Sequence, residues 1–409
     1  MSEARVEKLV TSLKQTACDG FLVTNLTNIY YLTGFHGTAG TIFISEGLRL
    51  FLTDSRYSLL AREQVKGFDI IETRQPLTEI AQLIRDDKLK TIGFEGEAIS
   101  YNFYQHLRSI FTGYQLESLN DLIENLRMIK DSGEIETIGQ ACKISDQAFL
   151  DALDFIKPNQ TSEIDLANFL DFRMRGLGAS GPSFDFIVAS GQRSAMPHGR
   201  ASDKIIRQGE TLTMDFGCIY NHYVSDMTRT IHIGQPSDEE RAVYELVLKS
   251  NRAVIDDVKA GIKRCDYDRI ARQVIAQAGY GDFFTHGIGH GIGLAIHEIP
   301  YFGQSADLVE AGMTITDEPG IYEEGLVGVR IENELLVVEH METKYGKFYA
   351  FQPFTYLPID TTPVVLELMN EEEISWLNDY HQMVYDTLSP RMTERERIWL
   401  KEKTKPLEK

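Results

Sequence analysis

The stretch 211–233 constrains the fold of this chain more than any other part of it. Two β-rich runs flank the polar residues 220–222, which predicts a β-hairpin. Asp215 and Asp226 are equally far from the centre of that turn. An antiparallel ladder would then place them opposite each other, with Cβ atoms about 4.5–5.5 Å apart. Like charges at that distance repel, so a bound cation would hold them together. A solvated acidic face is the alternative, because carboxylates are mostly exposed.

Three histidines lie close together in the glycine-rich stretch 285–300: His286, His290 and His297. The glycines among them disfavour a helix by about 1 kcal/mol each relative to alanine. They also allow the backbone to approach a ligand closely. A single histidine is more often a packed or surface residue, but three so close together favour a binding site.

Two glutamates follow in residues 316–333. Glu318 and Glu332 are equally far from Gly325, which predicts a second hairpin. On a strand, Arg330 and Glu332 would share one face. A surface ion pair is the simple alternative, and such pairs contribute little to stability. However, Glu332 comes shortly before the apolar run 335–338, which favours a half-buried strand whose carboxylate needs a partner.

These three segments supply four carboxylates and one imidazole, all from one half of the chain: Asp215, Asp226, His290, Glu318 and Glu332. A structural zinc site prefers Cys and His ligands, so this set contains too many oxygens for one. It suits two divalent cations that share bridging carboxylates about 3.5–4 Å apart. Oxygen ligands with one imidazole favour Mn²⁺, with Co²⁺, Fe²⁺ or Zn²⁺ as alternatives.

Composition excludes several other classes of protein. The formal net charge of −20 disfavours nucleic acid and anionic membranes as partners. The sequence has no apolar run long enough to cross a bilayer and no secretory signal at its N-terminus. The four cysteines lie far apart, which predicts free thiols and a cytoplasmic location.

The order of predicted elements indicates more than one domain. Short strands and helices alternate up to about residue 111, a pattern typical of α/β domains, and we expect residues 30–35 to be extended or turn. From residue 127 helices come in longer blocks and strands follow, which is typical of α+β. One of these helices is expected to begin after Ser237 and to continue to Lys259.

The motifs, taken in order, resemble those of a known family. Asp215 is followed eleven positions later by Asp226, and then come Gly-His-Gly, Glu-Pro-Gly and Arg-x-Glu. This order resembles the pita-bread metallopeptidases, the family of prolidase, aminopeptidase P and methionine aminopeptidase. The resemblance implies that the five residues named above are metal ligands and that Glu318 is also a proton shuttle.

The resemblance also implies roles for residues around the ligands. His198 and His297 match two histidines on the substrate side, which would stabilise the oxyanion of the tetrahedral intermediate. His286 matches a further active-site histidine, and with Tyr322 it is a candidate for the wall of a proline pocket. Arg330 matches a supporting arginine, which we expect to orient Glu332 or Asp226.

The fold implied by the resemblance is α+β in three parts. Residues 1–126 resemble a creatinase-like α/β N-terminal domain, and residues 127–345 match a pita-bread catalytic domain with a curved antiparallel sheet. Residues 346–409 resemble the tail of the long aminopeptidase P proteins. For this tail we expect a dimer contact, a lid over the site or a helix packed on the surface. A homodimer or homotetramer is the expected assembly.

The implied activity is that of an Xaa-Pro aminopeptidase, which releases the N-terminal residue from peptides with proline in second position. The attacking group would be a hydroxide that bridges the two metals. A prolidase, which cleaves only Xaa-Pro dipeptides, is the alternative. Some prolidases carry an arginine shortly after the His-Glu motif, and here Tyr301 follows instead. A binding protein without catalysis is a further alternative, but such relatives have usually lost metal ligands that this chain retains.

Overall fold

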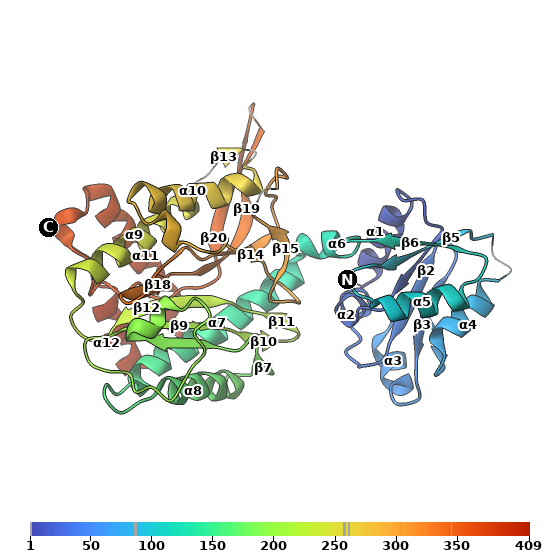
Figure 1. The fold of residues 1–409 in the computed structure, drawn as a ribbon, viewed down its shortest axis with the longest axis horizontal. Helices are drawn as coiled ribbons and strands as arrows, with labels where there is room; N and C mark the ends of the chain where they lie inside the picture. Colours follow the sequence, from blue (N-terminus) through green and yellow to red (C-terminus); the bar gives the residue numbers. More distant parts are fainter. Residues whose placement is uncertain (1, 86–87, 257–258, 261, 304, 345) are drawn as a thin grey trace. The chain divides into compact units, whose positions relative to one another are not determined.

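The computed structural model describes residues 2–85, 88–256, 259–260, 262–303, 305–344 and 346–409. The chain divides into two compact units, Met1–Arg127 and Met128–Lys409 (Figure 1). In the part of the chain that is described, every helix is too short or too polar to cross a membrane.

The first unit is built on a six-stranded mixed sheet with the strand order β4-β3-β2-β1-β5-β6. Its strands are β1 Gly20–Val23, β2 Thr41–Ser45, β3 Arg49–Thr53, β4 Asp69–Glu72, β5 Thr91–Glu95 and β6 Gln115–Leu119. Its helices are α1 Ser2–Leu13, α2 Leu26–Thr33, α3 Ser58–Gln64, α4 Pro76–Leu83, α5 Tyr101–Ile110 and α6 Glu124–Met128. Buried Leu77 of α4 and Leu107 of α5 pack with Phe43 of β2 in one apolar core, so these helices cover a face of the sheet.

Residues 30–33 are helical, so the prediction of extended or turn structure there is wrong. Asn25 caps the start of α2 by accepting a hydrogen bond from the Thr27 amide. Gly34 ends the helix in the left-handed conformation, at φ 77°. Ile29 and Leu32 are fully buried, three residues apart on one face. Capping at both ends and this buried face outweigh the β propensity of the two tyrosines.

The second unit contains longer helices and many short strands. Its helices are α7 Ser132–Phe155, α8 Glu163–Gly176, α9 Asp238–Ile255, α10 Arg264–Gln277, α11 Glu371–Leu388 and α12 Glu394–Lys403. Its strands are β7 Gly181–Pro182, β8 Ile187–Ser190, β9 Thr211–Phe216, β10 Cys218–Tyr220, β11 Tyr223–Val224, β12 Met227–His232, β13 Lys259–Ala260, β14 His290–Gly291, β15 Glu298–Tyr301, β16 Thr314–Asp317, β17 Gly320–Glu323, β18 Val327–Arg330, β19 Asn333–Thr343 and β20 Gly346–Pro353.

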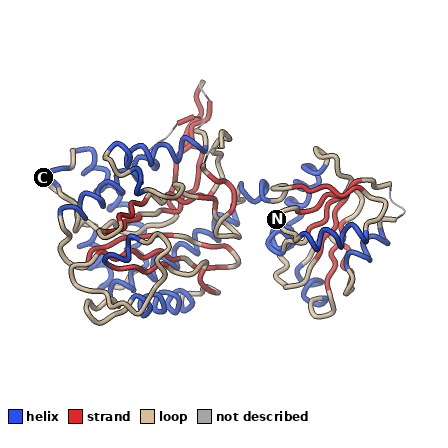
Figure 2. Tube along the Cα trace, in the orientation of Figure 1, coloured by secondary structure: helices blue, strands red, loops and turns tan. Residues whose placement is uncertain are grey.

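The strand pairs described in this unit are antiparallel throughout. The two main sheets have the orders β12-β9-β8 and β13-β20-β19-β16-β14-β15, and β17 and β18 form a separate hairpin. Figure 2 shows these strands between the pair α7 and α8 on one side and the pair α9 and α10 on the other. A single large apolar core joins the helices to the sheets, which fixes the strand ends that carry the predicted ligands.

Helix α9 begins as predicted and ends earlier. Ser237 and Glu240 form a capping box at its start. The helix ends at Ile255, and residues 257–258 lie outside the described part. Lys259 is in β13, where it pairs with Tyr349 of β20, so sheet pairing replaces the predicted last turn.

The segment after residue 346 is part of the same compact unit as the residues before it. Strand β20 pairs along β19, and Leu377, Val384 and Leu388 of α11 are buried in the common core. The C-terminal segment therefore contributes to the interior of this unit.

Candidate metal centre

The hairpin that carries the two aspartates has a different register from the one predicted. Residues Asn221 and His222 form its turn, both with positive φ (45° and 71°), which is typical of a type I′ turn. The ladder pairs Asp215 with Thr228. Direct opposition of Asp215 and Asp226 is therefore wrong, because the turn is centred one residue later. Asp226 lies two residues before Thr228, so the two aspartates are diagonal neighbours on one face of the sheet.

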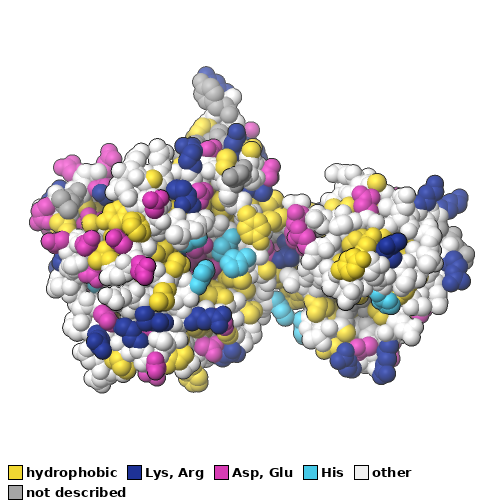
Figure 3. Space-filling view, viewed as in Figure 1, with side chains coloured by type: hydrophobic (Ala, Val, Ile, Leu, Met, Phe, Trp, Pro, Cys, Tyr) yellow, Lys and Arg dark blue, Asp and Glu magenta, His cyan; other side chains and the backbone are white. Residues whose placement is uncertain are grey.

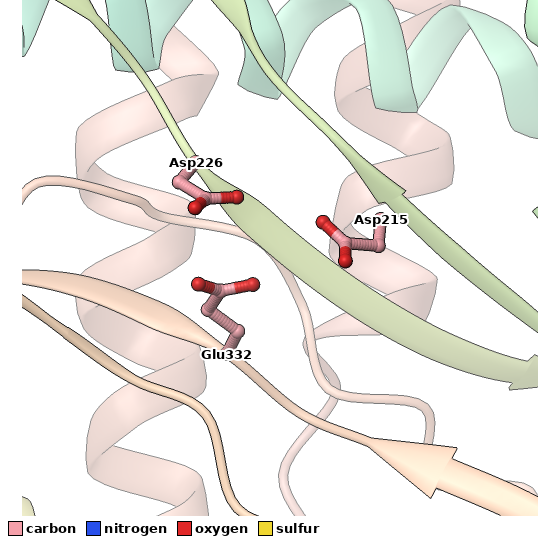
Figure 4. Close-up of side chains that lie close together, drawn as sticks. All are labelled: Asp215, Asp226 and Glu332. Atoms are coloured by element: carbon pink, nitrogen blue, oxygen red, sulfur yellow. The ribbon is translucent and has the colours of Figure 1, made fainter. Parts of the chain in front are cut away.

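Three carboxylates meet in this unit: Asp215, Asp226 and Glu332. Oxygens from all three lie within 4.8 Å of one another, and Figure 4 shows the side chains pointing toward one another. Each of the three residues is at most 8% exposed. Within the described part, Asp215 Oδ1 and Glu332 Oε1 have no hydrogen-bond partner. Burial raises the pKa of all three carboxyls, and repulsion among them raises those of Asp226 and Glu332 further. Buried carboxylates that keep oxygens without partners fit a site for divalent cations.

His290 and Glu318 complete the predicted ligand set beside this cluster. His290 Nε2 lies 3.7 Å from Asp226 Oδ2 and 3.5 Å from Glu318 Oε1. His290 Nδ1 is 3.1 Å from the carbonyl of Gly291, and a donated hydrogen bond there leaves Nε2 with its lone pair toward the carboxylates. Burial lowers the pKa of His290 to about 4 and raises that of Glu318 to about 8. The structure thus brings all five predicted ligands into one group.

Glycines on both sides of His290 are required by close backbone packing. A Cβ on Gly289 would lie 2.2 Å from the carbonyl oxygen of Thr316, and one on Gly291 would lie 2.3 Å from that of Ile299. Both distances are far below van der Waals contact. In this motif the glycines therefore allow neighbouring strands to approach His290, whereas the sequence suggested close approach to a ligand.

The second hairpin has the predicted centre. Strands β17 and β18 pair Gly320 with Arg330, which centres the turn on Gly325 at φ 85°. Glu318 and Glu332 both lie just beyond the open end of this ladder, two residues from Gly320 and Arg330. The amide of Glu332 donates to the carbonyl of Thr228 at 3.1 Å, which joins this hairpin to β12.

Arg330 contacts a different ligand from the two expected. Its guanidinium donates to Asp215 Oδ2 at 2.5 Å and to Thr228 Oγ1 at 3.0 Å. Thr228 in turn donates to Glu332 Oε2 at 2.7 Å. Arg330 therefore holds Asp215, not Asp226, and reaches Glu332 through Thr228. Sequence reasoning missed Thr228, which only the observed register places opposite Asp215.

The remaining predicted residues line one cavity of about 750 Å³ with the five candidate ligands, Tyr322 excepted. His198 and His297 are exposed on its wall. His286 Nε2 lies 2.8 Å from the hydroxyl of Tyr322, which also accepts from Arg330 at 2.6 Å. Burial lowers the pKa of His286 to about 4 and raises that of Tyr322 to about 12. Figure 3 shows histidine side chains gathered on this face of the second unit, beside acidic ones.

The cavity also has apolar and charged lining that the sequence did not single out. Phe184, Ile187 and Ile296 supply apolar surface. Arg200 also lines the cavity and pairs with Asp185 at 2.8 Å, with both side chains about three-quarters exposed (76% and 73%). The cavity therefore combines apolar walls with one exposed ion pair.

Comparisons with known proteins cover most of the chain. Residues 136–339 match Metallopeptidase family M24, residues 5–129 match the Creatinase/Prolidase N-terminal domain, and residues 347–407 match the C-terminal region of peptidase M24. An uncharacterised peptidase of Bacillus subtilis is 42% identical over 338 residues, which are 82% of this chain and 96% of that protein.

Two solved structures are similar over most of their length. One is an Xaa-Pro dipeptidase from Bacillus anthracis, with a TM-score of 0.82 and 38% identity over 88% of this chain and 99% of the other. The second is an X-Pro aminopeptidase from Thermotoga maritima, with a TM-score of 0.77 and 37% identity over 87% of this chain and 98% of the other.

Proposed function

Because the chain belongs to Metallopeptidase family M24, we propose that it is an Xaa-Pro aminopeptidase, which releases the N-terminal residue from peptides with proline in second position. Family membership confirms the predicted α+β fold, a creatinase-like domain before a pita-bread catalytic domain, and makes the chain a hydrolase of peptides. The observation that carries the proposal is the convergence of the buried carboxylates of Asp215, Asp226 and Glu332, of which Asp215 Oδ1 and Glu332 Oε1 have no hydrogen-bond partner in the described part.

We propose that this group of side chains holds two divalent ions. The candidate ligands are Asp215, Asp226, His290, Glu318 and Glu332. Carboxylate oxygens with one neutral imidazole suit Mn²⁺ first, with Co²⁺, Fe²⁺ or Zn²⁺ as alternatives. When bound, such ions lower the pKa of a water and polarise a carbonyl.

The chain's own residues would then orient the peptide and move protons. Glu318 is within the cavity and beside His290, so in this proposal it takes a proton from the attacking water and returns it to the leaving proline nitrogen. His198 and His297 are exposed to the same cavity and would donate to the developing oxyanion. His286, hydrogen-bonded to Tyr322, would form part of the wall around the proline ring.

Product analysis tests this proposal directly. Metal-free protein would be supplied with Mn²⁺ and incubated with matched peptides of the forms Xaa-Pro-Yaa and Xaa-Ala-Yaa. We expect release of the first residue from the proline peptide alone and only with the metal. Equal cleavage of both peptides, or cleavage that does not depend on added metal, would contradict the proposal.

A dipeptidase activity is a second candidate, favoured by Arg200 on the cavity wall. An exposed ion pair contributes at most about 1 kcal/mol, so a substrate carboxylate could replace Asp185 at little cost. A dipeptidase needs such a cation, since the carboxylate follows the proline directly. Arg200→Gln should then raise KM for Xaa-Pro far more than for Xaa-Pro-Yaa, whereas an aminopeptidase should prefer the tripeptide before and after the change.

We also propose a cytoplasmic location and a homo-oligomeric state, as a dimer or tetramer. The four cysteines are free thiols, three of them buried, which supports a reducing compartment. Sedimentation of the purified chain would measure the oligomeric state.

A further inference from the structure

A buried arginine lies directly behind the candidate metal centre. Arg229 of β12 is 1% exposed and follows Thr228, whose hydroxyl faces the carboxylates. Because side chains alternate along a strand, Arg229 points to the opposite face of the sheet. Arg229 is not among the site residues predicted from the sequence.

The guanidinium of Arg229 donates to five oxygens. They are the carbonyls of Thr228 (3.0 Å), Glu332 (2.5 Å) and Leu357 (3.4 Å), Asn333 Oδ1 (2.8 Å) and the hydroxyl of Tyr380 (3.1 Å). All five contacts come from Nη1 and Nη2, whereas Nε has no hydrogen-bond partner in the described part of the chain. The buried charge of Arg229 is therefore stabilised by neutral oxygens.

These oxygens belong to three segments of the chain. Thr228 lies on the strand that Asp226 precedes, and Glu332 is itself a candidate ligand. Leu357 and Tyr380 belong to the C-terminal segment. Tyr380 is 7% exposed and donates its own hydroxyl proton to the carbonyl of Leu357 at 2.7 Å. Its orientation is therefore fixed, and its oxygen is left to accept from Arg229.

We propose that the C-terminal segment positions the metal ligands, with Tyr380 holding Arg229 and Arg229 holding the backbone at Thr228 and Glu332. The inference rests on the proposed metal site. Tyr380 and Arg229 are positioning residues, since neither lines the cavity. Partners that orient metal ligands from outside typically change metal affinity about 10–100-fold when removed.

A purely structural role for Tyr380 predicts a different result for stability and metal affinity. The ring packs against Trp376, with centroids 5.7 Å apart, and a phenylalanine at 380 retains that packing. Loss of the hydroxyl then removes only the hydrogen bonds to Leu357 and Arg229. A structural effect would lower the stability of the metal-free protein and leave its metal affinity unchanged.

The experiment compares Tyr380→Phe with Tyr385→Phe in the full chain. Tyr385 is on the same helix and is half-buried. Its hydroxyl is not among the described hydrogen-bond partners of Arg229. Mn²⁺ binding to metal-free protein would be measured by calorimetry, and thermal unfolding would be measured without metal. We expect Tyr380→Phe to weaken Mn²⁺ binding about tenfold, with kcat largely restored at saturating Mn²⁺. Tyr385→Phe should bind Mn²⁺ as the wild type does.

A second variant keeps the inference testable if Tyr380→Phe does not fold. Arg229→Lys retains the charge and loses the planar fork, so it should also weaken Mn²⁺ binding. Wild-type Mn²⁺ affinity in either folded variant would overturn the inference. Absence of Mn²⁺ binding by the wild-type protein would instead contradict the proposed function, so the two failures are distinguishable.

Discussion

Two groups of residues on the cavity wall differ in burial and in hydrogen bonding. We call the carboxylates Asp215, Asp226, Glu318 and Glu332 the acidic wall, and His198 and His297 the histidine wall. On the acidic wall, Asp215 and Glu332 are buried and tied together by Arg330 and Thr228. On the histidine wall, His198 and His297 are exposed. A rigid, water-poor arrangement suits cation binding, whereas groups that meet a substrate must remain accessible. In the proposed function, one wall would therefore provide metal affinity and the other would provide contacts to the transition state.

Removing a candidate ligand from the acidic wall should have the largest effect on metal binding and activity. Glu318→Ala is expected to abolish metal occupancy and peptide cleavage while the fold survives. Elemental analysis and turnover would measure both, with exposed Glu324→Ala as a matched control. Wild-type turnover in Glu318→Ala would contradict the assignment of Glu318 as a metal ligand and proton shuttle.

Changing the histidine wall should separate catalysis from metal binding. His297→Ala should keep both metals and lower kcat by about 10²–10³-fold, because its contact is formed in the transition state. The comparison is with His340→Ala, an exposed histidine on β19 outside the cavity. An unchanged kcat would remove His297 from the mechanism.

Weakening the support of the acidic wall should have an intermediate effect. Arg330→Lys retains the charge but cannot contact Asp215, Thr228 and Tyr322 together, since lysine lacks the planar fork. We expect Mn²⁺ affinity to fall about 10-fold or more. Calorimetry would measure it, with exposed Arg269→Lys as control. Equal affinities would show that Arg330 does not support the ligands.

The smallest expected effect is a pH dependence of stability without metal. Burial raises to about 8 the pKa values of Glu318 and of Glu334, a fully buried residue of β19. The folded state therefore binds more protons than the unfolded state between about pH 4.5 and 8. Stability contributed by these groups is therefore lost as pH rises. His290, with its pKa lowered to about 4, has the opposite effect up to about pH 6.5.

Between about pH 6.5 and 8 the carboxylates therefore dominate. The free energy of unfolding of the metal-free protein should fall across this window. Added Mn²⁺ should reduce the fall, because the cations would neutralise Glu318, whereas Glu334 is outside the candidate ligand set and does not line the cavity. Chemical denaturation at several pH values would measure this, and a rising stability across the window would contradict the burial of these groups.

Local sequence was a good guide wherever one short segment contained all the information. The centre of the β17–β18 turn followed from Gly325, and the start of α9 followed from Ser237. It failed at the β9–β12 hairpin, where equal spacing of Asp215 and Asp226 suggested the wrong register. Asn221 and His222 both adopt positive φ, and this moves the turn by one residue. It failed also at residues 30–33, where the caps of α2 decided the structure.

By itself, the sequence determined which residues could bind metal, because residue type sets ligand chemistry and motif order is a property of the chain. Tertiary structure alone decided the partners of those residues. Arg330 contacts Asp215 across 115 positions, and Arg229 contacts Tyr380 across 151. Such contacts depend on strand register and on which helix covers which sheet. Those are set by burial of the whole apolar core, which no local pattern contains.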